Sequence, residues 1–176
     1  MDESIVDAQV VGATQYRGDV PDEFYYMAIA GLGVSLAGFG GIIAALDRRP
    51  AANSPVAAWR IRNIAFTGFS LTFTGFGTVA LYAVTSGDLT ITVRAASLLL
   101  AAADLLWLRF ETARGPAWTS EGQRRVAIAT AVALTVATLS NVAYGASGFL
   151  QVLLLAHLGS PVSIFFNTVR DATSGE

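Results

Sequence analysis

The chain has 176 residues, of which 53% are hydrophobic and 14% charged, against about 25% charged in ordinary soluble domains. The net charge of −2 leaves no basic surface for nucleic acid, and the lack of cysteine excludes disulfides, thiolate chemistry and sulfur-ligated metals. All eleven basic residues are arginine, so lysine Schiff bases and lysine-dependent phosphate loops are also excluded. The high hydrophobic and low charged content is typical of a multi-pass membrane protein.

The N-terminal segment is acidic. Residues 1–22 contain several Asp and Glu residues against Arg17 alone, the reverse of the basic start of a signal peptide. We therefore expect residues 1–22 to form an external tail of low order, and the apolar segment that follows to be retained in the mature protein.

Five apolar segments follow, each close to the ~20 residues that a helix needs to cross a bilayer. The third contains Arg94 and Asp104. The last two share residues 126–169, which contain no Asp, Glu, Lys or Arg, and a Gly-Ala-Ser-Gly turn at 145–148 divides them. A single span with a re-entrant segment is the alternative for this run. The expected spans are 24–46, 63–87, 89–110, 126–145 and 149–169.

Arginine placement predicts the orientation. With five spans, all arginines except Arg17 and Arg94 fall on one side, which the positive-inside rule assigns to the cytoplasm. The prediction is therefore an all-α integral membrane bundle of about five transmembrane helices in the prokaryotic plasma membrane. Its N-terminus is outside, its C-terminus is cytoplasmic, and residues 171–176 form a cytoplasmic tail.

Small residues recur at helical spacing, and such faces let membrane helices approach closely. In the second span, Phe-Thr-Gly-Phe at 66–69 recurs at 73–76, which places both copies on nearly one face. Either these faces hold the helices of one chain together, or the first span docks onto another subunit. The packing residues are Gly33, Ala37, Gly41 and Ala45 in the first span, and Ala129, Ala133 and Ala137 in the fourth.

Polar residues within the spans are the candidates for function, because burying charge in a bilayer is costly. The candidate pore residues are Arg94, Asp104, Asn141, Gln151 and His157. Arg94 and Asp104 share a broad face of the third span but lie about 15 Å apart along its axis, too far to pair.

Each candidate also has a structural explanation. Arg94 can reach the outer headgroups, and an arginine at the cytoplasmic rim can hold Asp104, or the carboxyl can stay protonated. Asn141 and Gln151 can bond neighbouring helices. A single histidine, His157, defines neither a metal site nor a bis-histidine haem site, so no metal or cofactor is expected.

One short motif resembles a known family. Gly145-Ala146-Ser147-Gly148 is similar to the Gly-x-Ser-Gly of rhomboid intramembrane proteases, and Ala156-His157-Leu158-Gly159 is similar to the region of their catalytic histidine. The resemblance implies a serine hydrolase using Ser147 and His157. Ten residues on one helix span about 15 Å, however, far beyond the ~3 Å of a nucleophile–base hydrogen bond. The resemblance is therefore interpreted as coincidental, and no catalytic residue is assigned.

Three hypotheses result. The first is a structural or accessory subunit, without enzymatic activity, that packs through its glycine and alanine faces against further copies or another membrane protein. The second is a small oligomeric ion channel or carrier lined by the five polar residues, with Pro161 breaking the fifth span beside a cavity. The third is the serine hydrolase. In each case the bilayer is a partner and nucleic acid is not.

Overall fold

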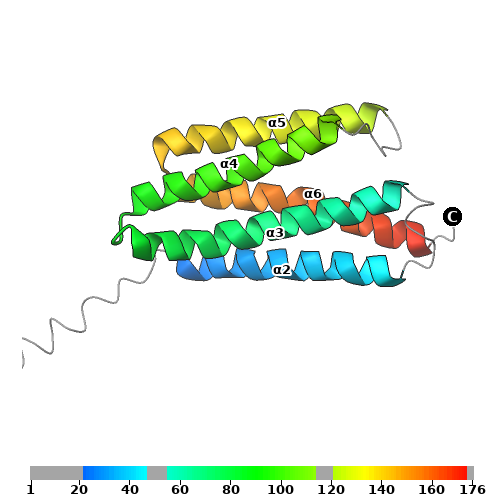
Figure 1. The fold of residues 1–176 in the computed structure, drawn as a ribbon, viewed down its shortest axis with the longest axis horizontal. Helices are drawn as coiled ribbons and strands as arrows, with labels where there is room; N and C mark the ends of the chain where they lie inside the picture. Colours follow the sequence, from blue (N-terminus) through cyan, green and yellow to red (C-terminus); the bar gives the residue numbers. More distant parts are fainter. Residues whose placement is uncertain (1–21, 47–54, 114–120, 174–176) are drawn as a thin grey trace, which may run out of the picture.

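Five helices make up the bundle in the computed structural model, which describes residues 22–46, 55–113 and 121–173 (Figure 1). Each contains a stretch of 20 to 27 residues that is long and apolar enough to cross a membrane. The predicted all-helical bundle with five spanning-length helices is confirmed. The helices are α2 (Glu23–Leu46), α3 (Pro55–Val84), α4 (Leu89–Ala113), α5 (Glu121–Tyr144) and α6 (Ser147–Thr173).

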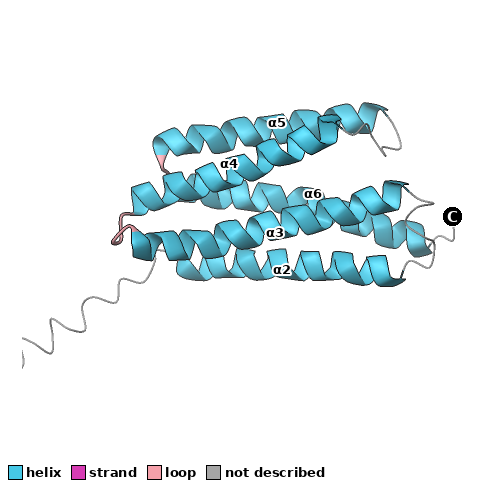
Figure 2. Ribbon diagram, viewed as in Figure 1, coloured by secondary structure: helices cyan, strands magenta, loops and turns pink. Residues whose placement is uncertain are grey.

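The helices lie side by side along the length of the bundle. The most extensive contact is between α2 and α3, followed by that between α4 and α5, while α6 packs behind them against α3 and, less extensively, α2, α4 and α5 (Figure 2). Short turns at 85–88 and 145–146 lie at one end, which we call the hairpin end. We call the other the arginine end, because it carries Arg60, Arg62, Arg109, Arg124, Arg125 and Arg170.

Local chemistry explains both hairpin turns. Asp88 Oδ1 accepts a hydrogen bond from the N–H of Ile91 at 2.9 Å, which caps the start of α4. Gly145 has a φ of 69° and ends α5, and its N–H donates to Asn141 O at 2.7 Å. A Cβ atom at Gly145 would lie 2.9 Å from Thr90 Cγ2, so the turn also needs glycine for its close approach to α4.

Four helices extend further toward the arginine end than their predicted spans, among them α5, which begins at Glu121 instead of residue 126, and α6, which ends at Thr173 instead of residue 169. α3 begins at Pro55 instead of residue 63, and proline suits a first helical turn because its missing N–H would have no partner there. α4 continues to Ala113, so Glu111 lies within the helix and not in the following link. All four extensions include charged residues, and a search for uncharged apolar runs ends at such residues.

The last apolar run forms two helices of spanning length, α5 and α6, with no re-entrant segment. The expectation that Pro161 interrupts the fifth span is wrong, because α6 continues through it. Membrane helices tolerate proline when neighbouring groups compensate. Since Pro161 has no N–H, the carbonyl of His157 lacks its usual helical donor.

Glycines bring α2 and α3 into backbone contact. A Cβ atom on Gly33 would lie 2.5 Å from Gly68 O, and one on Gly68 would lie 2.6 Å from Gly33 O. Gly75, from the second copy of the repeat, meets α2 in the same way at Tyr26 O, 2.6 Å from its ideal Cβ. These contacts support packing within one chain.

The other predicted small-residue positions behave differently. Gly41 has no atom within 4 Å of an added Cβ, because the contact face of α2 follows steps of three and four through Gly33, Ala37 and Gly40. On α5, Ala129 and Ala133 are exposed. Ala137 is half-buried, and Ala45 lies outside the residues whose side chains the structure describes.

The hydrophobic core occupies the half of the bundle nearer the hairpin end. Large apolar side chains such as Phe69, Phe73 and Val136 instead cover the outer surface, as expected for helices that face lipid. The core residues come from α2, α3, α4 and α6, and are Tyr26, Ile29, Leu71, Val93, Ala96, Leu100, Leu150 and Leu154.

Candidate functional site

Packing differs between the two halves of α5. Thr135, Thr138 and Asn141, in the half nearer the hairpin end, are buried. Between Val126 and Leu134, toward the arginine end, no residue of α5 is buried. The bundle is therefore closed at the hairpin end and loosely packed at the arginine end.

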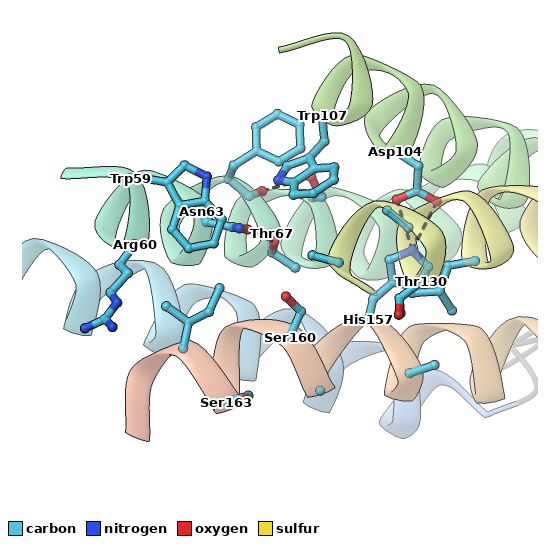
Figure 3. Close-up of a pocket in the computed structure, with 18 of the residues that line it drawn as sticks. Trp59, Arg60, Asn63, Thr67, Asp104, Trp107, Thr130, His157, Ser160 and Ser163 are labelled. Carbon is cyan, nitrogen blue, oxygen red and sulfur yellow. Dashed lines mark hydrogen bonds and ion pairs between the residues drawn. The ribbon is translucent and has the colours of Figure 1, made fainter. Parts of the chain in front are cut away.

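A cavity of about 1120 Å³ lies in the arginine half, between α3, α4, α5 and α6 (Figure 3). Trp59 and Arg60 lie toward one end of it, and Asp104 and His157 at the other. The uncharged polar part of its lining consists of hydroxyl and amide side chains: Asn63, Thr67, Ser70, Thr130, Ser160, Ser163 and Asn167. Its apolar walls include Phe66, Leu71, Leu100, Trp107, Val126, Leu134 and Ile164.

Helical periodicity places these polar residues on the cavity. On α3, Asn63, Thr67 and Ser70 follow steps of four and three, which keeps them on one face. On α6, a similar face begins at Ser160 and ends at Asn167. Sequence reasoning did not identify these residues, although their spacing was a usable signal.

Asp104 and His157 contact each other at the deep end of the cavity. His157 Nε2 lies 3.0 Å from Asp104 Oδ1 and 3.1 Å from Oδ2, so one imidazole nitrogen faces both carboxylate oxygens (Figure 3). The His157 side chain is only 8% exposed and the Asp104 side chain only 14%. The other ring nitrogen, Nδ1, lies 2.7 Å from Leu153 O, one turn earlier on α6.

This geometry constrains where the protons are. A carbonyl oxygen accepts but cannot donate, so His157 Nδ1 must carry a hydrogen toward Leu153. A second proton must then lie between Nε2 and Asp104, because otherwise a lone pair would face a carboxylate. The proton belongs either to an imidazolium beside a carboxylate or to a carboxyl beside a neutral imidazole. Both arrangements are neutral overall, as a site within a membrane requires.

The other three candidate pore residues line no part of this cavity and hold the hairpin end together. Arg94 Nη2 donates to Ala143 O at 2.9 Å. Asn141 Nδ2 donates to Ser97 Oγ at 2.9 Å, and its Oδ1 accepts from the N–H of Ala146 at 3.1 Å.

Gln151 joins the start of α6 to the start of α2. Its Nε2 donates to Asp22 Oδ2 at 2.7 Å, and its backbone carbonyl accepts from the Tyr25 hydroxyl. Of the five candidates, the structure therefore brings together Asp104 and His157 and leaves the other three at the hairpin end.

The two residues of the rhomboid-like motif do not meet within the chain. Ser147 begins α6, and His157 lies ten residues further along the same helix, about 15 Å away along the axis. Both ring nitrogens of His157 already have partners, Leu153 O and the Asp104 carboxylate.

A buried contact fixes the side of the cavity near the arginine end. Trp59 Nε1 donates to Glu111 Oε1 at 2.8 Å, and Arg62 Nη2 lies 3.7 Å from the same oxygen. This contact ties α3 to α4 and holds an indole against the cavity. The remaining charged residues of its lining are Arg60, on α3, and Arg170, on α6.

No family model matches the chain, and no curated protein or solved structure is significantly similar to it. The cavity and the chemistry of its lining are therefore the basis for assigning a function.

Proposed function

We propose that the protein is a small membrane carrier whose cavity binds a solute from the arginine end. The observation that supports this proposal best is a cavity that occupies one half of the bundle, carries several polar side chains among apolar walls, and ends at an intramembrane Asp–His pair. Carriers alternate between states open to one side, and their binding sites lie near the middle of the bilayer between helices.

A carrier fits this geometry better than a channel. An open channel needs a continuous polar path, whereas the core residues Leu71, Leu100 and Leu154 close the bundle beyond the pair. A structural subunit fits less well too, because a buried ion pair is weak evidence for stability and is often replaceable by apolar residues. Intramembrane ionisable residues more often mark substrate, ion or proton paths.

By the positive-inside rule, the arginine end faces the cytoplasm of a prokaryotic cell. In this orientation the cavity opens inward and the N-terminus of α2 lies outside. The described state is then the inward-open state, and the contacts of Arg94, Asn141 and Gln151 are the ones that separate when the carrier opens outward.

The proposed function is tested by flux. The purified protein is reconstituted in liposomes, and a panel of small organic acids, amines and sugars is screened for uptake. We expect one class to be carried, with flux lost in Asp104→Asn and His157→Gln. Ser35→Ala is the matched control, because it removes a polar side chain of α2, a helix that contributes no residue to the cavity lining. Flux in neither the wild type nor the control, or equal flux in all four proteins, would contradict the proposal.

A structural or accessory role is the second candidate, and the exposed Ala129 and Ala133 of α5 favour it. A small-residue face turned outward suits contact with a further copy or with another membrane protein. Native mass spectrometry from mild detergent tests this role. Ala133→Leu should dissociate an assembly formed through α5, while the neighbouring Val132→Leu should leave it intact.

A further inference from the structure

We infer that the cavity takes an organic anion bearing one carboxylate together with one proton, and that Asp104 receives the proton while His157 binds the anion. This inference rests on the proposed carrier function and names its substrate class and coupling ion. Three observations support it: the protons that the Asp–His contacts require, the charges of the cavity lining, and the apolar walls.

Charge balance couples the anion to a proton. The pair is neutral as it stands, so an added anion would leave a net negative charge within the membrane, which is costly. One proton on the Asp104 carboxyl cancels that charge. The imidazolium of His157 is then released from its partner and is free to bind the anion.

The binding step can be written atom by atom. In the imidazolium–carboxylate form, a proton taken up from the aqueous phase adds to a carboxylate oxygen of Asp104. The hydrogen bond that His157 Nε2–H donates then shifts from that oxygen to the carboxylate of the solute, and the Nε2 proton stays on the ring. The Nδ1–H stays on Leu153 O, which keeps the ring in place. No covalent bond of the solute changes, and the filled site is neutral again.

A cation exchanged for the His157 proton would also balance, so the lining charges decide between the two. Apart from the pair, the charged lining residues are Arg60 on α3 and Arg170 on α6, and no residue of α5 that lines the cavity is titratable. On α4, the nearest other acid, Glu111, lies outside this lining and contacts Trp59 and Arg62. α2 contributes no lining residue. Asp104 is therefore the one acidic side chain among the described lining residues, so a cation would meet no second carboxylate there, whereas the imidazolium of His157 can bind an anion.

The walls suit the rest of such a solute. Phe66 and Trp107 offer aromatic faces, and Leu134 and Val126 offer aliphatic surface on the opposite helix. Binding sites for small molecules are mostly apolar with a few placed polar groups that fix orientation. We therefore expect an aromatic or aliphatic body with one carboxylate.

The test uses probes of matched shape and different charge: benzoate and octanoate as anions, benzamide as the neutral isostere and benzylammonium as the cation. His157 is the only histidine in the chain, so ¹⁵N-histidine labelling gives one residue's signals without assignment. Binding is followed by these signals and by tryptophan fluorescence, since Trp59 and Trp107 line the cavity. Proton uptake is measured with a dye in weak buffer.

We expect benzoate or octanoate to bind with uptake of about one proton per anion, the number that neutrality of the site requires. Both nitrogens of His157 should be protonated in the complex, and an infrared band of a protonated carboxyl should appear on binding. Asp104→Asn should bind the anion without proton uptake and without that band. His157→Gln should lose binding at least tenfold, and Ser35→Ala, on a helix outside the cavity lining, should match the wild type.

Three results would overturn the inference: stronger binding of benzylammonium or benzamide than of both anions, anion binding without proton uptake, and no binding of either anion. These outcomes are separable from failure of the carrier. Binding with proton uptake but without liposome flux would refute transport and leave the anion–proton site standing. Flux of a solute without proton movement would refute the anion–proton site and leave the carrier function standing.

Discussion

The two halves of the bundle solve the problem of polar groups in a membrane in opposite ways. In the hairpin half, each candidate polar side chain bonds a group on a neighbouring helix or turn. Asn141 is fully buried among the helices, and the exposed Arg94 bonds a carbonyl of α5. In the arginine half, small polar side chains such as Ser160 and Thr130 face a cavity instead. Asp104 and His157 lie at the boundary. The comparison teaches that polarity alone does not indicate a pathway, because the same residue types serve as interhelical bonds in one half.

The close-packed region should be the most sensitive to added volume. Gly33→Val places methyl groups where Gly68 O and the Thr72 backbone already lie, whereas Gly31→Val meets no atom within 4 Å. We expect the first variant to lose about 3 kcal/mol or more and the second to remain near wild type. Unfolding in mixed micelles of increasing SDS content measures the difference, and equal losses would refute the α2–α3 contact.

Breaking the boundary pair should have the next largest effect. Asp104→Leu and His157→Leu each leave one polar partner in a mostly buried place, at a cost of about 2 kcal/mol. The double variant should lose less than the sum of the two, since no unpaired group remains. Additive losses in the same unfolding assay would show that the two side chains do not interact.

Asn141 should matter moderately. Asn141→Ala removes hydrogen bonds to Ser97 and to the turn, which we expect to cost about 1 kcal/mol. The neighbouring Ser140→Ala removes only a bond within α5 and should change stability little. If Ser140→Ala costs as much as Asn141→Ala, the closure of the hairpin half does not depend on this interhelical contact.

The cavity should tolerate a larger side chain, whereas the close-packed hairpin half should not. Ser160→Phe extends into open space and should change the free energy of unfolding by about 0.5 kcal/mol or less. Ser97→Phe, at a fully buried position, should be strongly destabilising. Ser160→Phe should nevertheless abolish solute flux, because the ring fills the binding space. Retained flux in that variant would place the pathway elsewhere.

Much of this fold follows from the sequence. Apolar run length and charge placement predict the five helices, and the Gly-Ala-Ser-Gly turn predicts where the last run divides. Helical spacing also gives the face and depth of each residue.

The sequence does not give which helices are neighbours. For this reason, Asp104 and His157 were both named as candidates but not as partners, and Arg94 and Gln151 were grouped with them because all are polar residues within the spans. Helix neighbours are set by contacts between distant segments, such as Gly33 with Gly68, that no single-helix pattern encodes. The cavity itself lies where the α4–α5 pair separates from α3 toward the arginine end (Figure 1), and no local signal predicts this separation.

The most direct test of the account is water access along the bundle. The chain has no cysteine, so each introduced one is unique. Single variants Ser70→Cys and Ser160→Cys line the cavity, while Ser97→Cys and Thr138→Cys lie in the closed half. All four are treated with a charged methanethiosulfonate in proteoliposomes. We expect the cavity pair to react at least an order of magnitude faster, since thiolate formation needs water. Equal rates in the two pairs would contradict a cavity that opens at one end and stops at Asp104 and His157.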